Sequence, residues 1–269
     1  MKRFAVHTLS TAIILVVLFL ANTLLRPITF SPTVDLNPSL PSITLNGYTF
    51  HSETMGNPDN PVVIALHGGP SGDYRNLLPI APLSDDYHLV FYDQRMTGLS
   101  SRDFDGVLDI ESFFTDLDLF VDHFGAADPV ILLGHSWGAM LASGYASRFP
   151  EKVDRLVLIE PGLMRPDLAQ PYFEGQSGPG WSAYPALAWI WLNSWRVRTA
   201  EDPFAREDYI LSNAFPVAPG VGVHCGDVVP EAFEGWRASM RTLNETVLTY
   251  VNDPELLSEL DFISDAHRF

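Results

Sequence analysis

The sequence predicts an α/β fold, in which a mostly parallel sheet carries helices on both faces. Two observations support this prediction. Four short apolar segments indicate buried strands, at residues 61–66, 88–92, 129–134 and 155–160. Two further segments have apolar side chains at helical spacing and predict helices. One covers residues 109–124 and ends before Gly125, and the other covers residues 137–149 and ends before Pro150. Strands that are apolar throughout and alternate with helices are typical of a parallel sheet covered on both sides.

The flanking segments complete the predicted core at residues 43–162. Residues 43–53 alternate between apolar and polar side chains around Asn46-Gly47, which predicts a β-hairpin. After Gly162 the strand pattern ends, and residues 163–269 are rich in Trp, Pro and Gly. Two helical pieces there, 184–195 and 230–251, predict a helical cap over a site. Four tryptophans of this region would either line an apolar pocket or pack the cap onto the core: Trp181, Trp189, Trp191 and Trp195.

The N-terminal residues 1–26 predict a membrane anchor or a signal segment. Lys2 and Arg3 precede an uncharged stretch at residues 4–25, close to the ~20 residues that cross a bilayer. The positive end would stay in the cytoplasm, so the rest of the chain would lie outside it. A cleaved signal peptide would leave the domain secreted, but Ala21-Asn22-Thr23 is a poor cleavage site. Residues 27–42, with four prolines, predict a linker.

Composition argues against several classes of function. The 16 basic and 33 acidic residues give a net charge of −17, which repels nucleic acid and anionic lipid. Cys225 is the only cysteine, so the fold cannot depend on an intramolecular disulfide. The sequence shows no metal-ligand spacing and neither the P-loop nor the dinucleotide fingerprint, so we expect no metal and no cofactor.

The sharpest chemical signal is Gly134-His135-Ser136-Trp137-Gly138, a G-x-S-x-G motif between a predicted strand and a predicted helix. A sharp turn from strand to helix exposes a strained nucleophile, and the flanking glycines admit close backbone neighbours. We therefore expect Ser136 to be a nucleophile for acyl transfer. Its tetrahedral intermediate needs oxyanion donors, for which we expect the N–H groups of Trp137 and of Gly69 in His67-Gly68-Gly69-Pro70.

A third motif, Asp93-Gln94-Arg95 followed by Gly98 and Ser100, comes directly after the strand at 88–92. Together, HGGP, DQR-x-x-G-x-S and GHSWG resemble the proline iminopeptidase-like branch of the α/β-hydrolases, over about residues 43 to 162. The resemblance implies the α/β-hydrolase fold with a helical cap, and polar contacts from Asp93 and Arg95 that pin the oxyanion loop. The sequence departs from the family pattern at two positions where the family has glycine, Ser71 and Met96.

The resemblance also implies a substrate contact. Peptidases of this family hold the free amino terminus of the substrate with acidic residues of the cap. The stretch at residues 205–209 resembles one such cap segment, which makes Glu207 a candidate amine ligand. A solvated helix face is the alternative interpretation of Glu207.

The rest of the catalytic triad is less well marked. The expected order is Ser, then an acid, then His. Candidate acids are Glu160, after the strand at 155–160, and Asp227, and the candidate base is His267. Three interpretations stay open: a truncated family member whose C-terminal strands, acid and base are missing, a complete but displaced triad, and a catalytically inactive binding module.

The sequence therefore predicts a serine hydrolase that cleaves an ester or amide bond, such as an N-terminal peptide bond, through an acyl-enzyme on Ser136. An esterase or lipase-like hydrolase is the alternative enzyme. The partners expected are a small-molecule or peptide substrate and, through residues 4–25, a membrane, but no nucleic acid.

Overall fold

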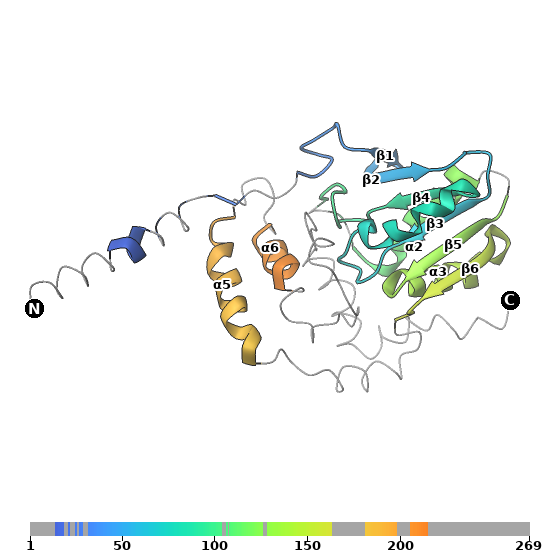
Figure 1. Cartoon of the computed structure of the whole chain (residues 1–269). Helices are drawn as coiled ribbons and strands as arrows, with labels where there is room; N and C mark the ends of the chain where they lie inside the picture. The colour runs from blue at the N-terminus through green and yellow to red at the C-terminus, as the bar shows by residue number, and fades with distance from the viewer. Residues whose placement is uncertain are drawn as a thin grey trace, which may run out of the picture.

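Six strands form one sheet in the part of the chain that the structure describes (Figure 1). The order of the strands is β1-β2-β4-β3-β5-β6. The computed structural model describes residues 14–18, 21, 25, 27–28, 32–103, 106, 108–125, 128–162, 181–197 and 205–214.

A hairpin forms one edge of the sheet, as predicted. Strands β1 (Ser42–Leu45) and β2 (Tyr48–Met55) pair antiparallel. The turn residues Asn46 and Gly47 both have positive φ, 46° and 80°. Two positive φ angles are the requirement of a two-residue hairpin turn, and Asn-Gly meets it at little steric cost. Strand β2 then joins the hairpin to β4 in antiparallel register.

The four predicted core strands are confirmed, and they are mutually parallel. They are β3 (Val62–Leu66), β4 (His88–Tyr92), β5 (Val130–His135) and β6 (Val153–Ile159). Their carboxyl ends therefore meet at one edge of the sheet. The HGGP, DQR and GHSWG motifs follow β3, β4 and β5, so the fold gathers all three motifs at that edge.

Two apolar clusters hold the layers together. The predicted helices appear as α2 (Ile110–Gly125) and α3 (Trp137–Arg148), which pack on one face of the sheet with strand residues such as Ile64 and Leu66. The alternate strand residues, such as Val63 and Ala65, face the other side and pack against the 3-10 helix η1 (Tyr74–Asp85). The alternation follows from the two-residue period of a strand.

The sequence did not predict η1. Pro79 and Pro82 lie inside it. Proline has no N–H to donate and interrupts an α-helical ladder, so no helical pattern is visible in the sequence there. Asp73 accepts a hydrogen bond from the Arg75 N–H at 3.0 Å and so caps the first turn.

Strand β6 is more exposed than predicted. Its sequence is apolar enough for a strand buried on both faces, yet Val157, Leu158 and Ile159 are all exposed. Strand β6 pairs with β5 and is the outermost strand among the described residues. An outermost strand has fewer neighbours to cover its side chains, which accounts for the difference. The short 3-10 helix η2 (Pro150–Lys152) leads from α3 into β6.

The described part of the cap consists of the 3-10 helix η4 (Trp181–Ala183), α5 (Tyr184–Ser194) and α6 (Ala205–Ala214). The predicted helix at 184–195 is confirmed as α5, whereas 230–251 lies outside the described residues. Figure 1 shows α5 and α6 apart from the sheet. Of the predicted anchor, residues 14–18 are helical. No helix that the structure describes is both long enough and apolar enough to cross a membrane.

Candidate active site

Ser136 lies at a sharp turn between β5 and α3. Its φ is 51° and its ψ is −114°, a conformation that L-residues rarely adopt. Such backbone strain costs of order 1–3 kcal/mol and persists only where the surroundings enforce it. The chain direction reverses from strand to helix at this residue, so the strained geometry of a nucleophile elbow is present at the predicted position.

Close packing enforces this turn. A Cβ atom on Gly134 would overlap the carbonyl oxygen of Gly138, one helical turn ahead. A Cβ atom on Gly138 would overlap the carbonyl oxygen of Leu66, at the end of β3, and would lie 2.8 Å from the carbonyl oxygen of His67. Both glycines of the motif are therefore required by contact between backbones, and Gly138 holds the elbow against the HGGP loop.

The HGGP loop passes directly beside the nucleophile. A Cβ atom on Gly68 would lie 3.1 Å from Ser136 Cβ and 2.7 Å from His135 Nδ1. Gly69 has a φ of 65°, which favours glycine, and its Cβ position faces open space. Gly69 is the residue that the sequence predicts, whereas no local pattern indicates the close approach of Gly68, because that contact joins two separate strand ends.

Two backbone N–H groups are free to bind an oxyanion. Trp137 is the first residue of α3, where N–H groups have no acceptor within the helix. None of the hydrogen bonds in the described part of the chain uses the N–H of Trp137 or of Gly69. The partial positive charge at the start of α3 adds to the attraction for a developing negative charge. The two predicted oxyanion donors are thus on segments that meet at Ser136.

Gln94 joins these two segments. Its Nε2 donates to the carbonyl oxygen of His67 at 2.9 Å, and its Oε1 accepts from Trp137 Nε1 at 3.0 Å. Its side chain is buried, so both contacts are shielded from water. Gln94 therefore couples the HGGP loop to the elbow. The sequence did not predict this role of Gln94, and the signal for it is that a buried tryptophan needs an acceptor for its indole N–H.

His67 supports the loop and is poorly suited to transfer protons. The ring is fully buried, and its Nε2 accepts from the Gln94 N–H at 3.0 Å. Its Nδ1, 3.1 Å from the carbonyl oxygen of Gly68, is therefore the protonated nitrogen. Burial lowers the pKa of His67, although Asp93 acts in the opposite direction. His67 is thus a neutral ring with both nitrogens engaged.

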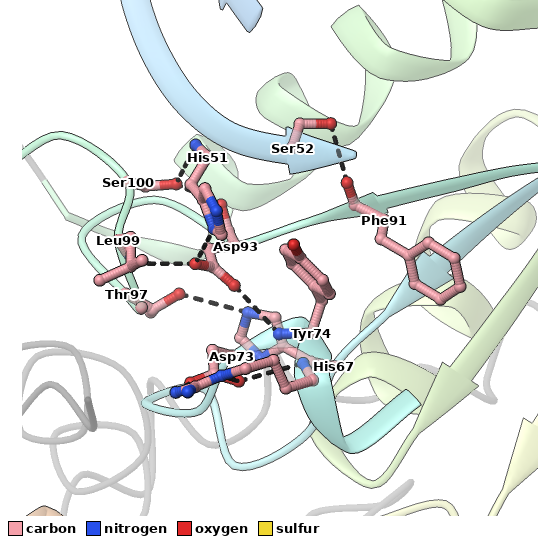
Figure 2. A network of polar contacts seen from close by, with 12 residues as sticks. His51, Ser52, His67, Asp73, Tyr74, Phe91, Asp93, Thr97, Leu99 and Ser100 are labelled. Atoms are coloured by element: carbon pink, nitrogen blue, oxygen red, sulfur yellow. Dashed lines mark hydrogen bonds and ion pairs between the residues drawn. The ribbon is translucent and has the colours of Figure 1, made fainter. Parts of the chain in front are cut away.

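Asp93 ties three segments together (Figure 2). Its Oδ1 accepts from the N–H of Tyr74, which begins η1, at 3.0 Å, and its Oδ2 accepts from the N–H of Leu99 at 2.8 Å. His51 Nδ1 of β2 lies 2.8 Å from the same Oδ2. Burial alone would raise the pKa of Asp93, but the hydrogen bond and charge of His51 hold it below its ordinary value. Asp93 thus pins the start of η1, the segment that follows the HGGP loop, whereas the resemblance implied a contact with the oxyanion loop itself.

Arg95 contacts helix α2 and strand β2. Its guanidinium forms a two-point ion pair with Asp116 of α2 and lies 4.3 Å from the ring centroid of Tyr48. Burial raises the pKa of Asp116 to about 6, although the contact with Arg95 opposes the shift. Arg95 therefore anchors the DQR segment to α2, whereas the resemblance implied a contact with the oxyanion loop.

The two departures from the family pattern are accommodated differently. Met96 has a φ of 63°, a conformation that favours glycine, and its side chain is buried against the core. Ser71 is buried in the turn after HGGP, where its N–H donates to the carbonyl oxygen of Gly69. Met96 therefore combines backbone strain with apolar burial.

Of the candidate acids, the structure describes Glu160. It follows β6, has a φ of 43°, and its carboxylate lies 3.8 Å from His135 Nε2 with the side chain 72% exposed. The strand end that carries Glu160 is close to the nucleophile, since the Ser136 N–H donates to the carbonyl oxygen of Ile159 at 3.0 Å. Asp227 and His267 lie outside the described residues.

Glu207 is not brought to the elbow. It lies on α6, which Figure 1 shows away from the strand ends that carry Ser136. The described residues contain no group of three or more His, Cys, Asp or Glu side chains that could hold a metal ion.

Several known proteins are similar to this chain in sequence or fold. Residues 61–184 match the family described as alpha/beta hydrolase fold. A cis-3-alkyl-4-alkyloxetan-2-one decarboxylase of Shewanella oneidensis is 32% identical over 126 residues, which are 45% of this chain and 38% of that protein. A proline iminopeptidase of Heyndrickxia coagulans is 36% identical over 110 residues, which are 39% of this chain and 36% of that protein. An epoxide hydrolase of Bacillus megaterium shows the same fold, with 21% identity, a TM-score of 0.53, and coverage of 80% of this chain and 74% of the other.

The core of the chain thus has the α/β-hydrolase fold. Its similarity to proline iminopeptidases agrees with the three motifs. The matched part spans little more than a third of the length of the two relatives described above.

Proposed function

We propose that this protein is a serine hydrolase that cleaves an ester or amide bond through an acyl-enzyme on Ser136. The observation that carries the proposal is the strained conformation of Ser136 at the start of α3, beside a glycine loop. A serine held at such a position without a chemical role would cost stability for no gain.

The proposed chemistry follows from the groups around Ser136. The hydroxyl oxygen attacks the substrate carbonyl carbon, its proton passes to a general base, and the carbonyl oxygen becomes an oxyanion. The N–H groups of Gly69 and Trp137 bind this oxyanion. The intermediate then expels the leaving alcohol or amine, which takes up the proton, and water releases the acyl group by the same steps in reverse. His267 as the base, with Glu160 or Asp227 as the acid, stays a prediction from the sequence.

The relatives suggest which substrates to test. Their names include a proline iminopeptidase, an oxetan-2-one decarboxylase and a soluble epoxide hydrolase. Ser136 favours carbonyl substrates, because epoxide hydrolases of this fold use an aspartate at the elbow. We therefore propose small acyl esters, strained cyclic esters and N-terminal prolyl amides as the substrate classes.

We also propose that residues 4–25 anchor the chain in a membrane, with the hydrolase domain outside the cytoplasm. The support is the uncharged apolar composition of this stretch after Lys2 and Arg3, together with its length near the ~20 residues of a membrane span.

The test is hydrolysis of a small panel by the full chain in detergent: 4-nitrophenyl butyrate, oxetan-2-one, proline 4-nitroanilide and styrene oxide. We expect turnover of at least one carbonyl substrate and none of the epoxide, and loss of that turnover in Ser136→Ala. The matched control is Ser143→Ala, also on α3, whose hydroxyl donates to the carbonyl oxygen of Ala139 at 2.8 Å. Turnover that survives Ser136→Ala would refute the proposal. A folded chain that neither turns over the panel nor becomes acylated would refute the proposal and identify a catalytically inactive chain.

A further inference from the structure

The outer face of α5 presents an unusual row of aromatic side chains. Trp181, Trp189, Trp191 and Trp195 are 90%, 45%, 50% and 60% exposed, and Tyr184 and Leu192 are exposed as well. Trp181 lies in η4, directly before α5, and Trp195 directly follows the helix, so the exposed side chains run along its whole length. We call this set the aromatic row. It contains no charged side chain.

One face of α5 is buried. Ile190, Asn193 and Ser194 are buried, and α6 packs beside them, with Arg206 Nε donating to Ser194 Oγ at 3.0 Å. Most of the aromatic row therefore lies away from this buried face, whereas Trp195 contacts α6 through the guanidinium of Arg206. A row of this kind on an exposed surface marks an interaction site.

The N-terminal segment leads to the same place. The Ile28 N–H donates to the carbonyl oxygen of Arg196 at 3.0 Å, and Ile28 forms a parallel bridge with Val197, just after α5. Ten residues before Ile28, the chain is helical at residues 14–18, and all five of these apolar side chains are 56–61% exposed. The end of α5 is therefore fixed to the chain close to where the proposed anchor ends.

We infer that the aromatic row lies in the headgroup region of a phosphatidylcholine-like, zwitterionic bilayer, beside the point where residues 4–25 enter it. Trp and Tyr favour this region because their rings are amphipathic. The net charge of −17 disfavours an anionic surface, and the uncharged row fits a zwitterionic one. Arg206, whose guanidinium lies 3.7 Å from the ring centroid of Trp195, can reach the lipid phosphates from there. The inference rests on the proposed anchor and is independent of the chemistry at Ser136.

The test uses the full chain in phosphatidylcholine vesicles, with and without bromine atoms on the upper part of the acyl chains. Bromine quenches nearby tryptophans, and the chain has six. The quadruple variant, which carries Trp181→Phe, Trp189→Phe, Trp191→Phe and Trp195→Phe, keeps the row apolar but removes its fluorophores. The matched control is Trp137→Phe, which removes a tryptophan buried beside Ser136. Flotation of the vesicles on a density gradient reports the anchor separately.

We expect the chain to float with the vesicles, bromine to quench its emission, and most of that quenching to be lost in the quadruple variant but retained in Trp137→Phe. A chain that floats without quenching, or with equal quenching in the quadruple variant, overturns the inference and leaves the anchor standing. A blue shift that grows with protein concentration, without quenching, assigns the row to a second copy of the chain and also overturns it. A chain that does not float overturns both the anchor and the inference, whatever its activity at Ser136.

Discussion

Replacing Gln94 by methionine should both destabilise the fold and slow the reaction of Ser136. Methionine keeps the volume of the side chain and removes both of its hydrogen bonds. The carbonyl oxygen of His67, at 2.9 Å, and the indole N–H of Trp137, at 3.0 Å, would then lose their buried partner. A buried polar group left unpaired costs about 1–3 kcal/mol, so the two together should cost about 2–6 kcal/mol.

This loss is a large fraction of the free energy of unfolding of a domain, about 5–15 kcal/mol. Urea unfolding followed by circular dichroism measures it. The rate of labelling by a fluorophosphonate, taken where both proteins are fully folded, measures the effect on the site. We expect slower labelling of Gln94→Met, because the HGGP loop and the elbow are no longer coupled.

A double-mutant cycle with Trp137→Phe isolates the contact between the two side chains. Residues in direct contact show coupling energies of about 0.5–3 kcal/mol, and we expect a value in this range. Additive effects, or a Gln94→Met chain labelled at the wild-type rate, would refute the assignment of Gln94 as a positioning residue.

Three further predictions follow from the same site. Gly138→Ala should lower the free energy of unfolding by more than the roughly 1–3 kcal/mol of ordinary overpacking, because its Cβ meets the backbone of Leu66. Gly125→Ala, whose Cβ meets one side-chain atom of Val130 at 2.8 Å and no backbone atom, should lower it less in the same urea assay, and equal losses would contradict the argument. Burial lowers the pKa of His67, so near pH 6.5 the unfolded chain gains a proton that the folded chain does not. The free energy of unfolding should therefore fall as the pH drops below that value. An NMR titration in which the folded His67 ring protonates between pH 7 and 5 would argue against this prediction. Met96→Gly should relieve about 1–2 kcal/mol of backbone strain but lose about 2–5 kcal/mol of buried apolar contact. The urea midpoint should therefore fall, and a rise would contradict the conclusion that burial of Met96 outweighs its strain.

The core was predictable because its signals are local. The strands that become β3, β4 and β5 are short apolar runs, and the hairpin at Asn46-Gly47 depends on two adjacent residues. The elbow at Ser136 was likewise predictable, because its two glycines, its strand and its helix are contiguous in sequence.

The contacts that complete the site were not predictable in this way. Gln94 meets Trp137 across 43 residues, and Gly68 meets Ser136 only because β3 and β5 are neighbours in the sheet. The exposure of β6 depends on which strands surround it, and no pattern within β6 records that.

The most direct test of the account is intact-mass analysis of the full chain after reaction with a fluorophosphonate, followed by peptide mapping of the adduct. We expect one adduct per chain, on Ser136, and none in Ser136→Ala, while Ser143→Ala reacts like the wild type. An adduct on another residue, or a folded chain that does not react, would contradict the assignment of Ser136 as the nucleophile.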